Sequence, residues 1–271
     1  MENKVNTANG KPMLALVTGA SSGIGLMYAH ELARTYKCDL LLVSNQEKEI
    51  AETANDIASK YGVHTIPLYR DLAKQDAAEE LHQWCRDNGI EPDILINNAG
   101  VFFFNPLVET SMKRIEVMLM LHVVTVTKLC RLFGEDMCKR GKGYILNMSS
   151  MSAWMAMPGI QCYNATKAYL LNFSKSLWYE FKPYGVGVTV MTPGAVDTAL
   201  YGLAPNLRRL AVNLTVSIPP EKLVQRALKK MFKRKKQDMP GVLNHLFLPV
   251  MKHLPDWAVF FMIRKIGRFQ K

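Results

Sequence analysis

Cysteine is scarce in this sequence of 271 residues, and its spacing shows no pairing pattern. The number of cysteines is odd, and no two of them form a Cys-x-x-Cys pair. Small secreted scaffolds depend on paired cysteines, so the pattern excludes a disulfide framework. We expect free thiols, a reducing cytoplasmic compartment and no metal centre. The five residues are Cys38, Cys85, Cys130, Cys138 and Cys162.

Long hydrophobic runs are also missing. The longest clear run, Trp257–Ile263, has seven residues, whereas a helix that crosses a bilayer needs about 20. The first twelve residues are polar and lack the apolar core of a signal peptide, so we expect neither a signal peptide nor a spanning segment. No repeat or low-complexity segment stands out. A hydrophobic content of 49% with 21% charged residues excludes a disordered, collagen-like or coiled-coil chain.

Acidic residues are scarce only at one end of the chain. After Glu221 there are thirteen Lys and Arg residues but only two Asp and Glu residues, so this stretch carries the whole net charge of +11. In the 221 residues up to that point, the acidic and basic side chains balance, so that part of the chain carries no net charge. The basic balance therefore describes the last fifty residues and says little about the main body.

Short apolar segments alternate with amphipathic ones along the first 200 residues. This alternation is typical of a parallel β-sheet with helices on both faces, which predicts an α/β, doubly wound, Rossmann-like fold in a single domain. We expect strands at 14–17, 39–44, 64–69, 93–97, 143–149 and 186–192, and helices at 24–36, 46–61, 76–88, 112–140 and 163–181.

A glycine-rich turn, TGASSGIG, follows the first predicted strand and begins the first predicted helix. Gly19 permits a sharp turn, Gly23 lets the backbone approach a pyrophosphate, and Gly25 lets the helix pack closely on the strand. The free N–H groups at the helix N-terminus favour phosphate. An ordinary βα turn rich in Gly and Ser is the alternative.

Three further motifs follow in order: NNAG at Asn97–Gly100, YNATK at Tyr163–Lys167 and PGAVDT at Pro193–Thr198. With the glycine turn at Thr18–Gly25, they resemble the short-chain dehydrogenase/reductase family over about residues 12 to 200. The resemblance implies an enzyme that transfers a hydride between a nicotinamide cofactor and a substrate.

Tyr163 and Lys167 are four residues apart, so one face of a helix carries both side chains. A free tyrosine has a pKa of about 10, and a nearby ammonium lowers that value by stabilising the phenolate. The pair therefore suits acid–base chemistry near neutral pH. Alone, the same spacing is common in surface pairs.

A hydroxyl at the end of the fifth strand completes the implied catalytic group. The family's serine usually lies thirteen residues before the tyrosine, which corresponds to Ser150. Its hydroxyl is expected to polarise a substrate carbonyl. Ser149 and Ser152 are alternatives whose hydroxyls are satisfied by nearby backbone.

The family's fourth catalytic residue, an asparagine that helps to hold a water for proton relay, is replaced here. The matching stretch MLMLHVVTVTK has His122 at that position. A histidine could relay protons itself because its pKa lies near neutral. It could equally be a core histidine bonded to backbone, and the sequence does not decide between the two.

The second strand ends in Ser44 and Asn45, without the carboxylate that usually binds the ribose of NAD. The family's common arginine for NADP is missing there too. We expect NADP(H) rather than NAD(H), with Ser21, Ser22, Ser44, Asn45 and Lys48 around the 2′-phosphate. The resemblance further implies cofactor contacts from Thr18, Gly19, Gly23, Ile24, Gly25, Asp71, Asn98, Ala99, Gly100, Tyr163, Lys167, Pro193, Gly194, Val196 and Thr198.

Two apolar segments flank the implied site. One contains Trp154, Met155 and Met157, and the other, 199–216, matches the family's variable substrate lid. They suit an apolar substrate pocket, or else belong to the core or to a contact between subunits of a homo-oligomer. The stretches around Ser150 and Tyr163 resemble the branch that acts on long-chain 3-oxoacyl, sphingoid or steroid ketones.

The basic end has helical spacing at 221–236 and again at 256–269. Basic residues beside Trp257, Phe260 and Phe261 favour a peripheral contact with a membrane, or a helix packed on protein with a solvated basic face. No nucleic-acid-binding motif is present. We divide the chain into a dinucleotide-binding catalytic domain, 12–238, and a basic amphipathic extension, 239–271.

Two functions remain open from the sequence. The first is an NADP(H)-dependent enzyme that interconverts a ketone and a secondary alcohol. The second is a non-catalytic, cofactor-binding or regulatory member of the same fold. Ser150, Tyr163 and Lys167 favour the enzyme, and His122 is the one feature that favours the alternative.

Overall fold

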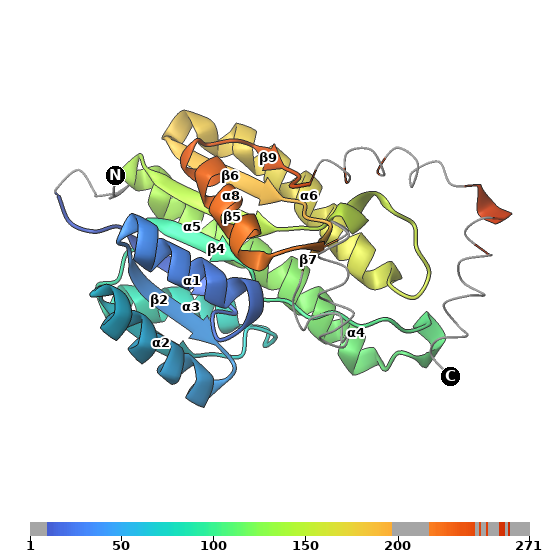
Figure 1. Cartoon of the computed structure of the whole chain (residues 1–271), viewed down its shortest axis with the longest axis horizontal. Helices are drawn as coiled ribbons and strands as arrows, with labels where there is room; N and C mark the ends of the chain where they lie inside the picture. Colours follow the sequence, from blue (N-terminus) through green and yellow to red (C-terminus); the bar gives the residue numbers. More distant parts are fainter. Residues whose placement is uncertain are drawn as a thin grey trace.

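The computed structural model describes residues 10–196 and 217–241, with positions 244, 248, 255–257 and 260. Seven strands form a parallel sheet in the order β3-β2-β1-β4-β5-β6-β9 (Figure 1). This confirms the predicted doubly wound parallel sheet. The strands are β1 (Leu14–Thr18), β2 (Asp39–Ser44), β3 (Thr65–Tyr69), β4 (Ile94–Asn97), β5 (Gly143–Met148), β6 (Val186–Met191) and β9 (Gln237–Asp238).

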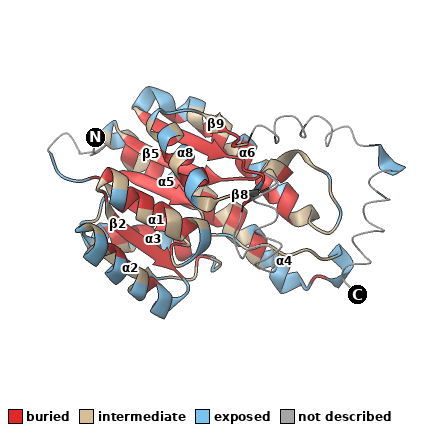
Figure 2. Ribbon diagram, in the orientation of Figure 1, coloured by how far each residue is buried: buried red, intermediate tan, exposed pale blue. Residues whose placement is uncertain are grey.

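Helices cover both faces of the sheet, and the strands are buried between them (Figure 2). The larger helices are α1 (Gly23–Tyr36), α2 (Glu47–Tyr61), α3 (Ala77–Asp87), α4 (Met112–Leu119), α5 (Thr125–Arg140), α6 (Gln161–Phe181) and α8 (Pro220–Phe232). Short elements are the 3-10 turns η1 (Leu107–Glu109), η3 (Met151–Trp154) and η4 (Lys182–Tyr184), and the parallel pair β7 (Ala195–Val196) and β8 (Ser217–Ile218).

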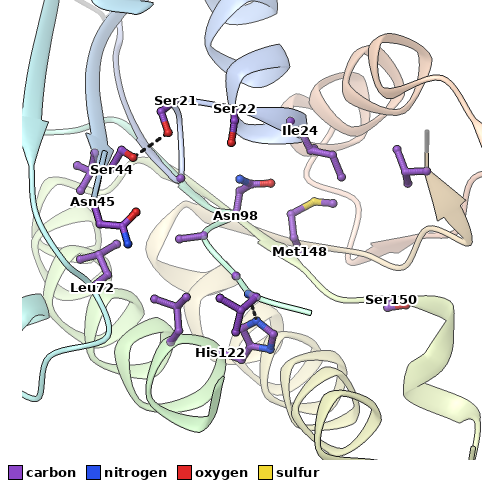
Figure 3. A pocket seen from close by; sticks show the side chains of 18 of the residues that line it. Ser21, Ser22, Ile24, Ser44, Asn45, Leu72, Asn98, His122, Met148 and Ser150 are labelled. Carbon is purple, nitrogen blue, oxygen red and sulfur yellow. Dashed lines mark hydrogen bonds between the residues drawn. The ribbon is translucent and has the colours of Figure 1, made fainter. Parts of the chain in front are cut away.

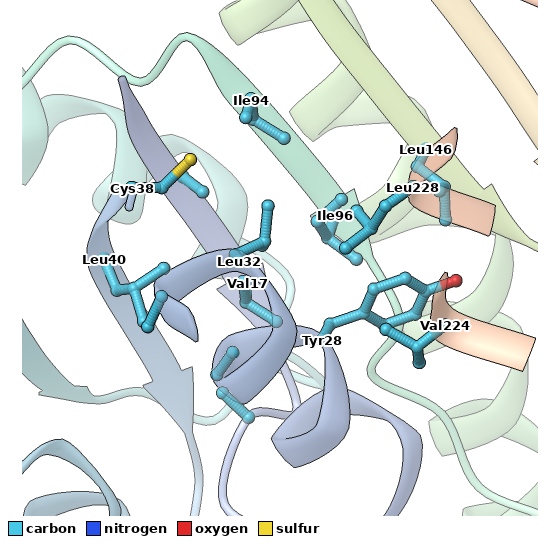
Figure 4. Packing of buried hydrophobic residues seen from close by; sticks show 14 of the residues in the cluster. Val17, Tyr28, Leu32, Cys38, Leu40, Ile94, Ile96, Leu146, Val224 and Leu228 are labelled. Carbon is cyan, nitrogen blue, oxygen red and sulfur yellow. The ribbon is translucent and has the colours of Figure 1, made fainter. Parts of the chain in front are cut away.

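Alternate residues of the central strands enter one of two apolar layers. Val17 and Leu40 belong to a layer with α1, α2 and α8, and Figure 4 shows its side chains from α1 and α8. Leu16 and Leu41 pack with α3, α5 and α6. Two-sided burial explains why the strands are continuous apolar runs in the sequence. The chain order reverses between β1 and β4, and sheets of this kind bind ligands at the carboxyl ends of the strands beside that point.

The sheet has a short strand at one edge and a proline at the other. β9 contributes two residues, which pair with the end of β6. The opposite edge strand, β3, carries Pro67 at its centre, opposite Leu42 of β2. Asp238 of β9 is buried and accepts hydrogen bonds from Arg226 of α8, so helix and edge strand are joined by an ion pair.

The helical stretch predicted at 112–140 is interrupted by a π-helical turn. α4 and α5 are joined by η2, Met120–Val124, whose backbone turns are wider than those of an α-helix. The combined stretch, 112–140, is long and apolar enough to cross a membrane by length and composition. Core helices of globular domains pass the same test. Here Leu129, Phe133 and Met137 of α5 are buried in the apolar layer that contains Leu16 and Leu41.

Candidate active site

The glycine turn has the conformation that its sequence predicts. Gly19 and Gly23 have φ values of +66° and +56°, in the region that favours glycine. A Cβ on Gly25 would lie 2.0 Å from the carbonyl oxygen of Gly19, so any side chain there would separate α1 from the turn. A Cβ on Gly23 would meet nothing within 4 Å, so the turn leaves open space in front of the helix N-terminus.

Thr18 joins this turn to the loop after β4. Its hydroxyl accepts hydrogen bonds from the backbone N–H groups of Asn98 and Ala99, both at 3.0 Å, and donates to the carbonyl of Ile96. The side-chain amide of Asn98 donates a hydrogen bond to the carbonyl of Thr18, at 3.1 Å. Thr18 therefore holds two cavity-lining loops together from behind, and it does not itself line the cavity.

Beside the turn, hydroxyl groups form a small network at the end of β2 (Figure 3). The Ser21 and Ser44 hydroxyl oxygens are 2.8 Å apart, and Ser21 donates to the side-chain oxygen of Gln46 at 2.7 Å. The backbone N–H of Gln46 donates to Ser44. Asn45 is exposed and lines the same end of the cavity. Lys48 does not line it, and its ammonium lies 3.9 Å from Glu52.

The neighbouring strand adds two charged residues that follow β3. Asp71 accepts from the N–H of Ala73 and lines the cavity as predicted. Arg70, which sequence reasoning missed, lines it too, with one guanidinium nitrogen 2.8 Å from Glu80 and its Nε buried without a partner. Arg70 follows β3 rather than β2, and in a parallel sheet these neighbouring strands end at the same edge.

These loops enclose a cavity of about 760 Å³ at the carboxyl ends of the strands. It brings together most of the predicted site and adds residues that the sequence did not indicate, among them Met27, Gln46, Arg70, Leu72, Leu121 and Met148. The predicted residues that line it are Gly19, Ser21, Ser22, Gly23, Ile24, Ser44, Asn45, Asp71, Asn98, Ala99, Gly100, His122, Ser150, Tyr163, Lys167, Pro193, Gly194 and Val196. Gly25 lies behind it, and Thr198 lies outside the described residues.

Tyr163 and Lys167 face the cavity from the first two turns of α6. Both side chains are buried, and the Lys167 ammonium lies 5.4 Å from the centre of the Tyr163 ring. Lys167 also donates to the carbonyl of Met148, at 2.8 Å. Burial lowers the pKa of Lys167 to about 7, because the protein interior disfavours the charged form. Phe102 packs edge-on against Tyr163 with ring centres 5.0 Å apart.

The two candidate serines make different hydrogen bonds. Ser149 donates its only hydroxyl proton to the carbonyl of Lys167, at 2.7 Å. Ser150 begins η3, where its hydroxyl oxygen accepts from the N–H of Ser152 at 3.1 Å. Within the described chain, no acceptor takes the proton of Ser150. The Ser152 hydroxyl is buried without a partner and lies outside the cavity lining.

His122 is 1% exposed and lies in the π-helical turn. Its Nε2 is 3.0 Å from the backbone N–H donor of Val101, and its Nδ1 is 3.0 Å from the Thr166 hydroxyl oxygen (Figure 3 shows the ring beside the cavity). Burial and the charge of Lys167 hold the pKa of His122 well below its usual value. The ring also packs edge-on against Tyr163.

The predicted substrate side is only partly described. Trp154, Met155 and Met157 are not among the residues that line the cavity, and the expected lid at 199–216 lies outside the described residues. In the basic extension, Trp257 and Phe260 are 73% and 65% exposed, and Phe261 is outside the described set.

Comparison with known proteins decides the family. Residues 13–205 match the family model described as short chain dehydrogenase. The chain belongs to the short-chain dehydrogenase family. It is 27% identical over 271 residues to the very-long-chain 3-oxoacyl-CoA reductase of Homo sapiens, an alignment that covers 98% of this chain and 83% of the relative.

Two solved structures are similar to this chain over most of its length. One is an enzyme from Sphingobium yanoikuyae in complex with NADPH, with a TM-score of 0.76, 27% identity and coverage of 90% of this chain and 96% of the other. A second is the bulky-bulky ketone specific alcohol dehydrogenase from Comamonas testosteroni. Its TM-score is 0.74 at 25% identity, and the match covers 96% of this chain and 94% of the other.

Proposed function

We propose that this short-chain dehydrogenase is an NADP(H)-dependent oxidoreductase that interconverts a ketone and a secondary alcohol on an apolar substrate. The observation that carries the proposal is the convergence of Ser150, Tyr163 and Lys167 on the cavity into which the glycine turn opens. An acid–base pair and a hydroxyl donor beside a phosphate-binding turn are the groups that hydride transfer to a carbonyl requires.

The residues of the cavity fit a dinucleotide phosphate. The N-terminus of α1 has no side-chain cap from Ser22, and the open space at Gly23 leaves its N–H groups available to a pyrophosphate. At the other end, Arg70 offers guanidinium donors to a 2′-phosphate, and the Ser21 and Ser44 hydroxyls would donate to it by releasing their bonds to Gln46 and to each other. NADPH in the Sphingobium structure supports this cofactor.

Each catalytic side chain has a separate task in the proposed reaction. The bound cofactor supplies a hydride in the reductive direction. Ser150 has its hydroxyl oxygen fixed by Ser152, and its free proton is donated to the carbonyl oxygen of the substrate. Tyr163 gives the proton that completes the alcohol. Lys167 stabilises the phenolate that remains and holds the nicotinamide ribose.

The proposed substrate is a long-chain 3-oxoacyl, sphingoid or steroid ketone. The name of the human relative supports a long acyl chain, and the Comamonas enzyme supports a bulky ketone. Apolar side chains at the cavity wall, including Met27, Leu121 and Met148, suit such a molecule. The similarity to oxidoreductases over nearly the whole chain argues against a non-catalytic, cofactor-binding role.

We further propose a cytoplasmic homo-oligomer that contacts membranes peripherally. Exposed apolar side chains at Val108, Met112 and Leu119 support a contact between subunits. Exposed aromatic rings at Trp257 and Phe260, in a region that carries thirteen basic residues, support contact with an anionic lipid surface.

Substitution of Tyr163→Phe tests the proposed function. We expect the variant to bind NADPH normally, measured by cofactor fluorescence, and to lose turnover of long-chain and steroid ketones by about 10²–10⁴-fold. The parent should prefer NADPH to NADH. Tyr169→Phe on the same helix is the control, because Tyr169 bonds Thr127 away from the cavity. Near-normal turnover by Tyr163→Phe, or no turnover by the parent on any ketone, contradicts the proposal.

A further inference from the structure

Three segments of the site meet at one buried imidazole. His122 belongs to the π-helical turn, Val101 belongs to the loop after β4, and Thr166 lies on α6 one residue before Lys167. The ring fills the space above the loop so closely that a Cβ on Gly100 would lie 2.7 Å from its Nε2. Among the described residues, no other side chain forms hydrogen bonds both to the loop after β4 and to α6.

The hydrogen bonds define the protonation of the ring. The backbone N–H of Val101 is a donor, so Nε2 accepts and carries no proton. A neutral imidazole then has its proton on Nδ1, which donates to the Thr166 hydroxyl. That hydroxyl donates onward to the carbonyl of Tyr163, at 2.8 Å, so every donor in the chain finds an acceptor.

A second proton on the ring would be opposed from two sides. An Nε2–H group would face the N–H of Val101, donor against donor. The ammonium of Lys167 is the charged group that acts on the ring, and a second cation beside it in a buried site is unfavourable. Tyr163, packed edge-on against the ring, offers no negative charge in its neutral form.

We propose that His122 is a positioning residue that remains neutral during turnover and fixes the loop at Gly100–Val101 against the Tyr163–Lys167 face of α6. The inference rests on the proposed function, and it selects the backbone-bonded role of His122 over proton relay. A relay must release one ring nitrogen to water, whereas both nitrogens here are engaged by protein groups. The loop lines the cavity beside Tyr163, whose ring packs against Phe102, so its placement sets where a nicotinamide and a carbonyl meet.

The state of the ring can be measured without any activity. Long-range ¹H–¹⁵N correlation spectra of imidazole-labelled protein report the tautomer of each histidine, and the His122 signal is assigned by its loss in His122→Asn. We expect a neutral ring with its proton on Nδ1, whose pKa lies well below that of a free imidazole because of burial and the charge of Lys167. A proton on Nε2, or titration between about pH 6 and pH 8, overturns the proposal even if the protein reduces ketones.

Kinetics of three variants provide the second test. An asparagine is shorter than the imidazole but keeps a group that can accept and donate, so His122→Asn should retain part of the contact and keep kcat within about tenfold of the parent, with an unchanged pH profile. His122→Ala removes both bonds and should lower kcat about 100-fold while NADPH binding changes little. Thr166→Val keeps the side-chain shape but removes both the acceptor for His122 and the donor to the carbonyl of Tyr163, and it should lower kcat about tenfold.

A proton relay predicts a different result. If the ring itself relays protons, the pH profile of kcat loses the ionisation of the imidazole in both His122→Asn and His122→Ala, even where the asparagine holds a relay water as in the family, and such a change contradicts the proposal. His82→Asn is the matched control, because His82 is bonded to Asp136 outside the cavity and its loss should leave kcat unchanged. If His122→Ala does not fold, Thr166→Val and the spectra still test the positioning role of His122. An unchanged kcat in Thr166→Val contradicts that role.

Discussion

The hydroxyl groups of Ser149 and Ser150 lie next to each other in the chain but are bound differently. The Ser149 hydroxyl donates its proton to the carbonyl of Lys167, and this hydrogen bond joins the end of β5 to α6. Ser150 keeps its proton for a ligand in the cavity. A spacing rule drawn from the family resemblance indicated Ser150, and the hydrogen bonds supply a physical reason for preferring it.

Alanine substitutions at the two serines should therefore have different effects. Ser150→Ala should lower kcat/KM by about 10²–10³-fold with little change in melting temperature, because a donor to the developing oxyanion is lost. Ser149→Ala should lower the free energy of unfolding by about 1 kcal/mol, because a buried carbonyl loses its donor, and should affect kcat/KM less. Steady-state kinetics and thermal melts of both variants measure this, and the reverse pattern would assign the catalytic hydroxyl to Ser149.

Lys167 makes the stability of the cofactor-free protein depend on pH. Its pKa is about 7 in the folded chain and about 10.4 when unfolded, so between these values the unfolded state binds more protons and stability rises with pH. The buried ammonium is therefore a cost that is largest below about pH 7 and disappears toward pH 10.

Lys167→Met should reveal this cost. At about pH 6.5 the variant should be more stable than the parent by at least about 1 kcal/mol, and the advantage should shrink as the pH approaches 9. Urea unfolding at the two pH values, without cofactor, measures the difference. An advantage that grows with pH would mean that the ammonium is stabilised rather than disfavoured by its surroundings.

At the scale of the element, α1 and its turn use two glycines for two purposes. Gly25 is required because the helix packs against the carbonyl of Gly19, whereas Gly23 faces open space in a conformation that disfavours side chains. The first supports the fold and the second leaves room for a ligand.

Alanine at each glycine separates these purposes. Gly25→Ala should lower stability by more than about 3 kcal/mol or prevent folding, because a Cβ cannot share space with backbone. Gly23→Ala should cost about 1–2 kcal/mol of backbone strain and should weaken NADPH binding at least tenfold. Thermal melts and cofactor titrations compare them, and tight NADPH binding by Gly23→Ala would contradict the role of this turn.

The elements themselves were largely predictable, because two-sided burial leaves apolar runs that are visible in the sequence. The first six strands and five helical stretches lie within a few residues of their expected positions. The π-helical turn was not predicted, because it is held by contacts of His122 with residues far away in the chain. β9 was missed because two residues carry no periodic pattern.

The candidate site was predictable wherever a motif supplied the residues. Arg70 was missed because its position depends on β2 and β3 ending at the same edge, which is a property of the sheet rather than of a local pattern. The bond that engages Ser149 could not be read from sequence for a similar reason, since its acceptor is on another element.

At the scale of the whole molecule, the charge is unevenly distributed. The residues up to Glu221 are neutral, and the last fifty carry +11 with exposed rings at Trp257 and Phe260. Each basic residue close to an anionic membrane contributes about 1 kcal/mol of binding, and the effect falls off within a Debye length.

Co-sedimentation with lipid vesicles tests the peripheral contact. We expect binding to vesicles that contain anionic phosphatidylglycerol at about 0.1 M salt, and its loss at about 1 M salt, where the Debye length falls from about 10 Å to about 3 Å. Trp257→Ala with Phe260→Ala should weaken binding about tenfold, whereas Tyr184→Ala, another exposed aromatic, should not. No binding at low salt would refute the contact.

The two edges of the sheet have a consequence for behaviour at high concentration. An open edge with a long run of unpaired N–H groups is a template on which another chain can add a strand. Here Pro67 removes a donor from the middle of one edge, and within the described residues the last strand at the other edge, β9, has two residues, of which Asp238 has its carboxylate bound by Arg226 of α8. The sheet is thereby protected from edge-to-edge growth into fibrils.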